Sequence, residues 1–330
     1  MIWVTWRQHR AQLLVTAGFL VVLGLLLLSS ATEARSFVSR YLPGHCPGGS
    51  DFCASVEVAV GLGERYDAVY TLFGWMPLVL PALIGAFWGA PLLGREYERG
   101  THRLAWTQGI PVRRWLAVKL GLLGGAVVAG GLLLSLMVGL WRPVFREGID
   151  SGFGNIGVFN MTGVAPAAWW LYAFALGACA GALLRRTLPA MALVVAGVAV
   201  TMVALFGLSD HYAVPERAVL TDAVVLDDPD ARLVDAGWID PSGRAVDAPT
   251  GCERPFDGRR TEAWHACLFT QGYTYAVSYH PPERFWRFQW TEAAILTAAS
   301  ALLMAGTVRP RGGGPGGGAG RARRAGRGRR

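Results

Sequence analysis

Charged residues are scarce in this sequence. Asp, Glu, Lys and Arg make up 16% of its 330 residues, whereas soluble globular domains carry about 25%. The shortage is uneven, because long apolar stretches carry no charge while the charged residues gather in a few loops and in the C-terminal tail. Such a distribution excludes an ordinary soluble enzyme and a disordered protein, and it favours a protein that crosses the membrane several times.

The sequence also lacks the common motifs of catalysis and metal binding. A phosphate-binding P-loop requires Gly-Lys-Ser/Thr, but the single lysine, Lys119, is followed by Leu120. The histidines are scattered without the spacing of metal ligands, and neither Gly-x-Ser-x-Gly nor His-Glu-x-x-His occurs. We therefore expect no catalytic residue, no metal site and no cofactor in this chain, and any ATP hydrolysis would take place on another subunit.

Six apolar stretches are long enough to cross a bilayer, which takes about 20 residues in a helix. Backbone N–H and C=O groups must be paired within each crossing segment, so runs of this length predict helices. Pro77, Pro81 and Pro91 interrupt the second stretch and predict kinks there. The sequence thus predicts an all-α integral membrane protein whose transmembrane domain, residues 11–308, has spans at about 11–29, 71–93, 120–140, 167–184, 188–208 and 290–308.

The distribution of basic residues predicts the orientation of these spans. With a cytoplasmic N-terminus, the cytoplasmic segments hold 18 basic residues, while the extracytoplasmic segments hold 13 basic and 20 acidic residues. Short arginine-rich loops stay in the cytoplasm, so both termini are expected there. Arg7, Arg10 and the small residues 29–31 also fit a signal peptide, but the apolar run of about 18 residues is long for one and favours an uncleaved span.

The cysteines agree with this orientation. Cys46 and Cys53 fall in the first predicted extracytoplasmic loop, Cys252 and Cys267 fall in the last, and Cys179 lies in the fourth span. Disulfides form on the oxidising side of the membrane. The pairs Cys46–Cys53 and Cys252–Cys267 would close the shortest loops, while crossed pairings and unpaired thiols remain alternatives.

Ionisable residues are almost absent from the predicted spans. Glu292 is the only one, and we place it within about a turn of the outer surface. Secondary transporters usually keep a buried carboxylate or histidine for the coupling ion. We therefore expect any transport to draw its energy from elsewhere, and an uncharged pathway suits an apolar or amphipathic cargo.

The segment between the second and third spans carries the most specific pattern. Residues 94–107 combine arginines with the carboxylates of Glu96 and Glu98, and a helix over 96–103 would place acidic and basic side chains at neighbouring positions. A solvated loop that follows the positive-inside rule explains the arginines. It does not explain the two carboxylates, which indicate a role beyond topology.

With this loop, the chain resembles the permease subunits of ATP-binding-cassette (ABC) transporters of the type-2 exporter class. In that family a Glu-x-x-x-Gly-Thr element follows the second span, and Glu96, Gly100 and Thr101 match it. The opening residues 3–10 and residues 282–289 before the last span resemble the actinobacterial branch of these permeases. The resemblance covers nearly the whole chain, including six spans and a large loop before the sixth.

The resemblance implies a permease without catalytic residues of its own. Residues 1–10 would form an amphipathic elbow on the membrane surface. A second permease subunit, identical or related, would complete the pathway in the bacterial plasma membrane, and nucleic acid is not an expected partner. The loop that couples the chain to a separate cytoplasmic ABC-type ATPase would carry Glu96, Glu98, Gly100, Thr101 and Arg103.

Two further regions lie outside the predicted spans. The extracytoplasmic loop 209–289, between the fifth and sixth spans, has room for a small cap closed by a Cys252–Cys267 disulfide. The Gly- and Arg-rich tail 309–330 cannot form a core and predicts a disordered cytoplasmic anchor on anionic lipid rather than an RNA-binding segment. The alternative function for the chain is a membrane sensor or regulator that transports nothing and binds a ligand with its cap.

Overall fold

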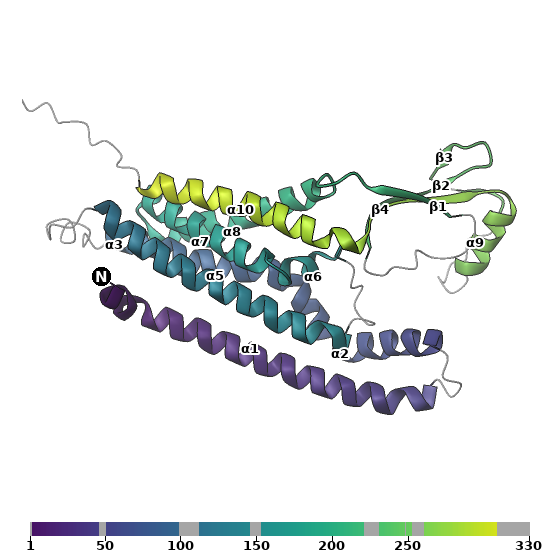
Figure 1. Cartoon of the computed structure of the whole chain (residues 1–330), viewed down its shortest axis with the longest axis horizontal. Coiled ribbons are helices and arrows are strands. Elements are labelled where there is room, and N and C mark those ends of the chain that lie inside the picture. The colour runs from purple at the N-terminus through teal and green to yellow at the C-terminus, as the bar shows by residue number, and fades with distance from the viewer. Residues whose placement is uncertain are drawn as a thin grey trace, which may run out of the picture.

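Six long helices form the body of the molecule (Figure 1). All six are long and apolar enough to cross a membrane, so the predicted all-α membrane fold is confirmed. The candidate spans are His9–Arg40, Gly61–Glu98, Arg114–Pro143, Ala165–Leu184, Thr187–Ser209 and Pro282–Val308. The computed structural model describes residues 2–45, 51–98, 112–145, 153–220, 231–247, 249–252 and 261–308.

The first two helices are much longer than the predicted spans. α1 (Ile2–His45) has 44 residues and α2 (Asp51–Ile84) has 34, whereas about 20 suffice for a bilayer. Most of the predicted loop 30–70 is therefore helical, as the ends of two neighbouring helices. An ion pair of 2.7 Å between Glu33 and Arg65 joins them there.

The irregular positions of the second span differ from the prediction. Pro77 and Pro81 stay within α2, and the residue inside α2 with non-helical dihedral angles is Tyr66 (φ −115°, ψ 21°). A π-helical turn, η1 (Gly85–Gly89), then separates α2 from α3 (Ala90–Glu98). Turns of this kind often occur at functional sites, and this one lies close to the predicted coupling loop.

α7 (Ala165–Leu184) is the central helix of the bundle. In its apolar stretch 67% of the residues are buried, compared with 78% in the second span, 17% in α8 (Thr187–Ser209) and 22% in the span that contains α10 (Phe285–Val308). α5 (Val112–Phe145), α8, α10, η1 and α3 all pack against it. The outer helices therefore present much of their apolar surface to lipid.

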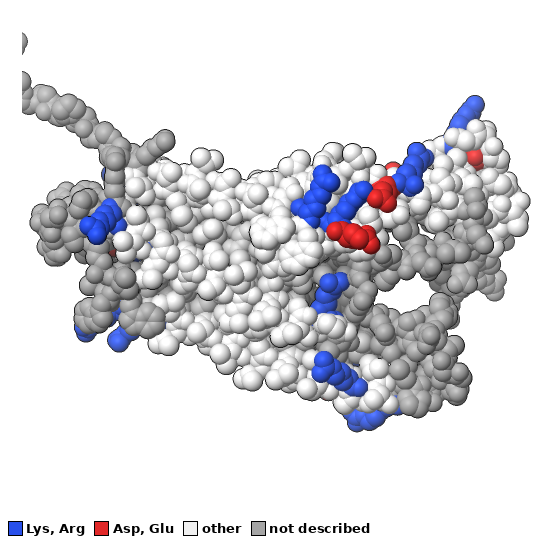
Figure 2. All heavy atoms as spheres, in the orientation of Figure 1, with Lys and Arg blue, Asp and Glu red and all other residues white. Residues whose placement is uncertain are grey.

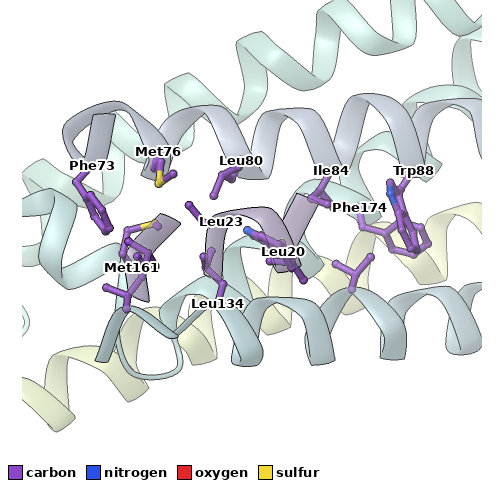
Figure 3. Packing of buried hydrophobic residues seen from close by; sticks show 14 of the residues in the cluster. Leu20, Leu23, Phe73, Met76, Leu80, Ile84, Trp88, Leu134, Met161 and Phe174 are labelled. Atoms are coloured by element: carbon purple, nitrogen blue, oxygen red, sulfur yellow. The ribbon is translucent and has the colours of Figure 1, made fainter. Parts of the chain in front are cut away.

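The main core fills the space between α1, α2, α5 and α7 (Figure 3). Leu23 of α1, Leu134 of α5 and Phe174 of α7 belong to one cluster of buried side chains. Met161 closes this cluster from the short helix α6 (Ile156–Met161). Because lipid is as apolar as these side chains, close packing rather than exclusion from water holds the helices together.

Close approach between helices on another side of α7 depends on glycine. A Cβ atom at Gly177 would overlap the Gly85 carbonyl oxygen, and one at Gly181 would overlap the Ala90 carbonyl oxygen. Gly177 and Gly181 have the spacing of a small-xxx-small pair. In this chain the pair packs against η1 and α3, so its packing partner is intramolecular.

A small sheet lies beyond one end of the bundle, within the segment between the fifth and sixth spans (Figure 1). The all-α prediction did not foresee it. Its strands are antiparallel in the order β1-β4-β2-β3, and helix α9 lies beside them. The bounds are β1 (Glu216–Leu220), β2 (Arg232–Ile239), β3 (Ala245–Val246), α9 (Thr261–Thr270), β4 (Thr274–His280) and the 3₁₀ turn η2 (Pro282–Arg284).

The described residues of 210–284, here called the cap, have a small core of their own. Trp238 of β2 packs against Phe269 of α9 and Tyr275 of β4, with ring centroids 5.5 and 4.9 Å apart. A disulfide joins Cys252 to Cys267, as the short spacing predicted. The disulfide ties the loop after β3 to α9, so the segment has a fixed structure rather than that of an open loop.

Successive spans run in alternating directions, so the segments that connect them lie at the two ends of the bundle (Figure 1). At the N-terminal end, α1 begins, α3 ends, α5 begins and a two-residue turn joins α7 to α8. At the cap end, α8 ends and α10 begins. On the face shown in Figure 2, charged side chains of both signs gather where the bundle meets the cap, and the bundle between the two ends shows almost none.

Candidate functional site

The predicted coupling residues that the structure describes lie at the N-terminal end of the bundle. Glu96 and Glu98 occupy the last turn of α3, and α5 begins at Val112. The pairing of Cys46 with Cys53 stays a prediction, since one partner lies beyond the described part of the chain. Outside the described residues lie Gly100, Thr101, Arg103, Cys46 and the tail 309–330.

Glu96 connects α3 to α5 through an ion pair. The Lys119 Nζ donates to Glu96 Oε1 at 2.5 Å, and the two side chains are 4% and 19% exposed. The Lys119 ammonium also lies 5.0 Å from the centre of the Trp115 ring, which is within the range of cation–π attraction. A lysine this deeply buried needs a nearby acid, so the pair fixes the end of α3 against α5.

Glu98 connects α3 to α8. Its Oε1 accepts a hydrogen bond from the Thr187 backbone N–H at 2.7 Å, and its Oε2 accepts one from the Thr187 hydroxyl at 3.0 Å. Thr187 is the first residue of α8, where unpaired N–H groups and the helix dipole favour a negative charge. A carboxylate from another helix thus caps α8.

Tyr97, between these two acids, contacts the turn that links α7 to α8. The Arg185 guanidinium lies 5.6 Å from the centre of the Tyr97 ring. Arg185 ends α7 in the left-handed conformation (φ 55°), and its N–H donates to the Gly181 carbonyl. Three consecutive residues of α3 therefore contact α5, α7 and α8.

α1 contacts the same region from its other side. Pro91 cannot supply the N–H that would normally bond the Phe87 carbonyl, and Gln12 Nε2 donates to that oxygen at 2.9 Å. Trp88 Nε1 donates to Thr16 Oγ1 at 3.1 Å. These two bonds attach α1 directly to the π-helical turn before α3. Residues 2–10, for which an amphipathic elbow stays a prediction, form the first turns of the same helix α1.

A second polar cluster lies at the cap end. Glu292, predicted to lie within about a turn of the outer membrane surface, is buried inside the protein (4% exposed), and its Oε1 accepts a hydrogen bond from Trp169 Nε1 at 2.7 Å. Gln289 Oε1 caps the start of α7 by accepting from the Val164 and Ala165 N–H groups at 3.0 and 2.9 Å. These bonds attach α10 to the central helix.

The junction between cap and bundle also contains titratable groups outside the spans. Burial raises the pKa of Tyr212 to about 12, and the nearby Glu292 contributes to this rise. Burial lowers the pKa of His280 below its ordinary 6.5. Its Nε2 lies 3.2 Å from the Asp210 carbonyl oxygen. The junction thus favours the neutral forms of both rings.

Comparison with known families decides the identity of the fold. A family profile described as ABC-2 membrane transporter related matches residues 17–208, which include most of the first five candidate spans, the π-helical turn and the last turn of α3. The chain belongs to the ABC-2 membrane transporter related family. No curated protein and no solved structure matches the chain.

Membership of the ABC-2 family agrees with the six apolar helices of a multi-pass membrane protein. The family is a membrane component of transport and is not itself catalytic. It therefore suggests a permease subunit whose partner is an ABC ATPase. The matched segment ends at Leu208, so the cap and α10 lie beyond it.

The sequence did not point to several residues that organise these two sites. Among the sequence motifs, Lys119 appears only as a lysine that does not fit a P-loop. A single lysine at the start of an apolar run nevertheless indicates a specific acidic partner. Thr187 followed by Pro189 matches a helix start, but nothing local indicates that Glu98 caps it. Gln289 ends the motif of residues 282–289, but the motif does not indicate that it caps α7. Arg232 gave no signal, because its partners lie far away in the sequence.

Proposed function

We propose that this chain is the membrane-spanning permease subunit of an ATP-driven ABC exporter. The observation that carries the proposal is the attachment of α3 to the rest of the bundle by the Glu96–Lys119 ion pair and the Glu98–Thr187 hydrogen bonds. Glu96 opens the Glu-x-x-x-Gly-Thr element, which continues into Gly100 and Thr101. A force on that element would thus be passed to α5 and α8.

The proposed orientation places the N-terminal end of the bundle in the cytoplasm of a bacterial cell. Support comes from the basic residues, since 18 of them fall in the segments on that side, including the turn at Arg185 and Arg186. Trp286 and Trp290 at the start of α10 are 55% and 61% exposed, and such rings favour the headgroup level of a bilayer. The cap would then lie outside the cell, where its disulfide is stable.

The proposed mechanism separates chemistry from movement. A cytoplasmic ABC ATPase would bind the loop that carries Glu96, Glu98, Gly100, Thr101 and Arg103, and would hydrolyse ATP. Movement of the loop would tilt α3 together with α5 and α8, because short polar contacts join these helices. The contact with α5 is buried and the contact with α8 is exposed. A second permease subunit, identical or related, would complete the translocation pathway.

The proposal is tested by purifying the tagged chain from native membranes in mild detergent and identifying its partners by mass spectrometry. We expect an ABC ATPase in stoichiometric amount, with recovery reduced at least tenfold by a Gly100→Pro/Thr101→Ala variant. The matched control is Glu33→Ala, which removes an exposed ion pair at the opposite end and should leave recovery unchanged. Recovery of intact chain without an ATPase would refute the proposal and favour a sensor whose cap binds a ligand.

A further inference from the structure

A small polar pocket lies where the cap meets the bundle, and the proposed coupling mechanism does not use it. Its free volume is about 10 Å³, the space of about one water molecule. Its polar lining comes from four helices and one strand, and each of these side chains is at least nine-tenths buried. The polar lining residues are Asn160, Trp169, Ser209, Arg232 and Glu292.

Arg232 enters this pocket from β2 of the cap, whereas the other lining residues belong to the bundle. Its Nη2 donates to Ser209 Oγ at 2.6 Å and to Asp210 Oδ1 at 2.7 Å. Its guanidinium also lies 5.6 Å from the centre of the Phe206 ring and 5.8 Å from that of Phe288. A carboxylate, a hydroxyl and two aromatic rings form a complete environment for a planar cation.

Glu292 contributes a buried carboxyl group to the lining of the pocket. Its Oε1 accepts from Trp169, while the hydrogen bonds of Arg232 described here go to Ser209 and Asp210. Asp210 and Glu292 therefore both lie near the positive charge of the Arg232 guanidinium. Without that cation, the buried carboxyl group of Glu292 and the carboxylate of Asp210, whose side chain is 34% exposed, would lose their shared positive neighbour, and another cation that entered the pocket could replace it.

Arg284 is another cationic side chain at this junction, and it is engaged elsewhere. Arg284 donates to the Val214 carbonyl at 2.6 Å and pairs with Glu216 at 2.7 Å. His280 contacts Arg284 through Nδ1 and the Asp210 carbonyl through Nε2. Arg232 is thus the cation that occupies the pocket in this part of the chain.

We propose that this pocket is an exit site for a cargo that carries a guanidinium or ammonium group on an apolar body, and that Arg232 occupies the site until the cap tilts away. The inference rests on the proposed export function and names the class of its cargo. The groups that hold Arg232 would hold the cargo cation, and Ile156, Met202 and Leu205 provide an apolar wall beside it. The site would thus select, among amphipathic cargoes, those that carry a positive charge.

The test uses the purified full-length chain in lipid nanodiscs and needs neither ATP nor the ATPase, so its outcome is independent of the test of export. The probe is benzylguanidinium, and its uncharged counterpart is benzylurea. We expect Arg232→Ala to bind benzylguanidinium at least tenfold more tightly than the natural chain, as measured by calorimetry. Adding Glu292→Gln to Arg232→Ala should remove most of that gain, and benzylurea should gain nothing.

Arg217→Ala is the matched control, because Arg217 is an exposed arginine of the same sheet and its loss should not change binding. Equal affinities of Arg232→Ala and the natural chain would overturn the proposal, and so would an equal gain for benzylurea. If Arg232→Ala does not fold, Arg232→Gln replaces it, since the amide can still donate to Ser209 or Asp210 without carrying a charge. That variant should show the same selective gain, and its absence would likewise overturn the proposal.

Discussion

Lys119 is buried to a degree that lysine tolerates only beside an acid. Its side chain is 4% exposed, and Glu96 is its described ion-pair partner. Removing one member of a buried pair leaves the other charge without compensation and costs about 3–5 kcal/mol. Since Glu96 is 19% exposed, we expect Glu96→Ala to lower the free energy of unfolding by about 3 kcal/mol, the low end of that range, as followed by thermal unfolding in detergent.

The double variant Glu96→Leu/Lys119→Met provides the control for this prediction. Replacing both charges with apolar side chains of similar size removes the cost of an unpaired ammonium. The double variant should therefore regain most of the stability lost by Glu96→Ala. A double variant as unstable as the single one would show that the ion pair itself is not what Lys119 requires.

Glu98 should behave differently, because its side chain is exposed while its partner is the start of a helix. Glu98→Ala removes the hydrogen bonds to Thr187, yet water can solvate the freed N–H. We expect little change in the thermal unfolding temperature and a clear loss of cargo-stimulated ATP hydrolysis in the complex with the ATPase. Glu98→Gln retains an acceptor and should be intermediate. Full activity of Glu98→Ala would exclude Glu98 from coupling.

At the scale of elements, the packing of α7 against η1 and α3 is the least tolerant contact. A Cβ atom at Gly177 would overlap backbone atoms of Gly85 and Ala90, and backbone cannot move aside as a flexible side chain can. Gly177→Val should therefore cost about 3 kcal/mol or more and reduce the yield of folded protein in size-exclusion chromatography. Gly139→Val is the matched control, since a Cβ at Gly139 meets no atom within 4 Å.

The disulfide of the cap makes a separate prediction about that element. It closes a loop with a sequence separation of 15 between Cys252 and Cys267, for which loop entropy gives about 3 kcal/mol of stabilisation. Cys252→Ser/Cys267→Ser should thus unfold the cap locally and speed its cleavage by an added protease. The bundle should keep its thermal stability, because its described core clusters do not include either cysteine. Equal cleavage rates would contradict the prediction.

The helices were predictable from the sequence and the sheet was not, for a physical reason. A spanning helix pairs its own backbone, so its signal is local and about 20 residues long. Strand β1 pairs instead with β4, where Glu216 lies opposite Tyr279, and such distant pairing leaves no local pattern. The same reasoning applies to the sites. Glu96 and Glu98 were found through a local motif, whereas Lys119, Thr187 and Arg232 depend on partners far along the chain.

At the scale of the whole molecule, the junction between cap and bundle should depend on pH. Burial, together with the positive charges of Arg284 and Arg232, holds the pKa of His280 below its ordinary 6.5. The folded junction therefore favours the neutral ring, while the unfolded chain takes up a proton as the pH falls through about 6.5. The contribution of the neutral His280 ring to the stability of the folded junction is therefore complete above that pH and is lost progressively below it.

We therefore expect the cap to be less stable at pH 5.5 than at pH 7.5, as measured by the protection factors of the β4 amides in hydrogen exchange, which correct for the pH dependence of the intrinsic exchange rate. His280→Gln should show a smaller difference between the two pH values, because it removes the titrating group. Protection factors that are independent of pH in the natural chain would mean that His280 does not titrate in this range.

α1 has a mechanical consequence that follows from its length alone. An unbroken helix of 44 residues is about 66 Å long and joins the region of η1 to the far tip beside α2. A tilt of 10° about its N-terminal end would move that tip by about 11 Å. α1 thus has the geometry of a lever arm. In the proposed orientation, a small rotation at the end where an ATPase would bind becomes a large displacement at the opposite end of the helix.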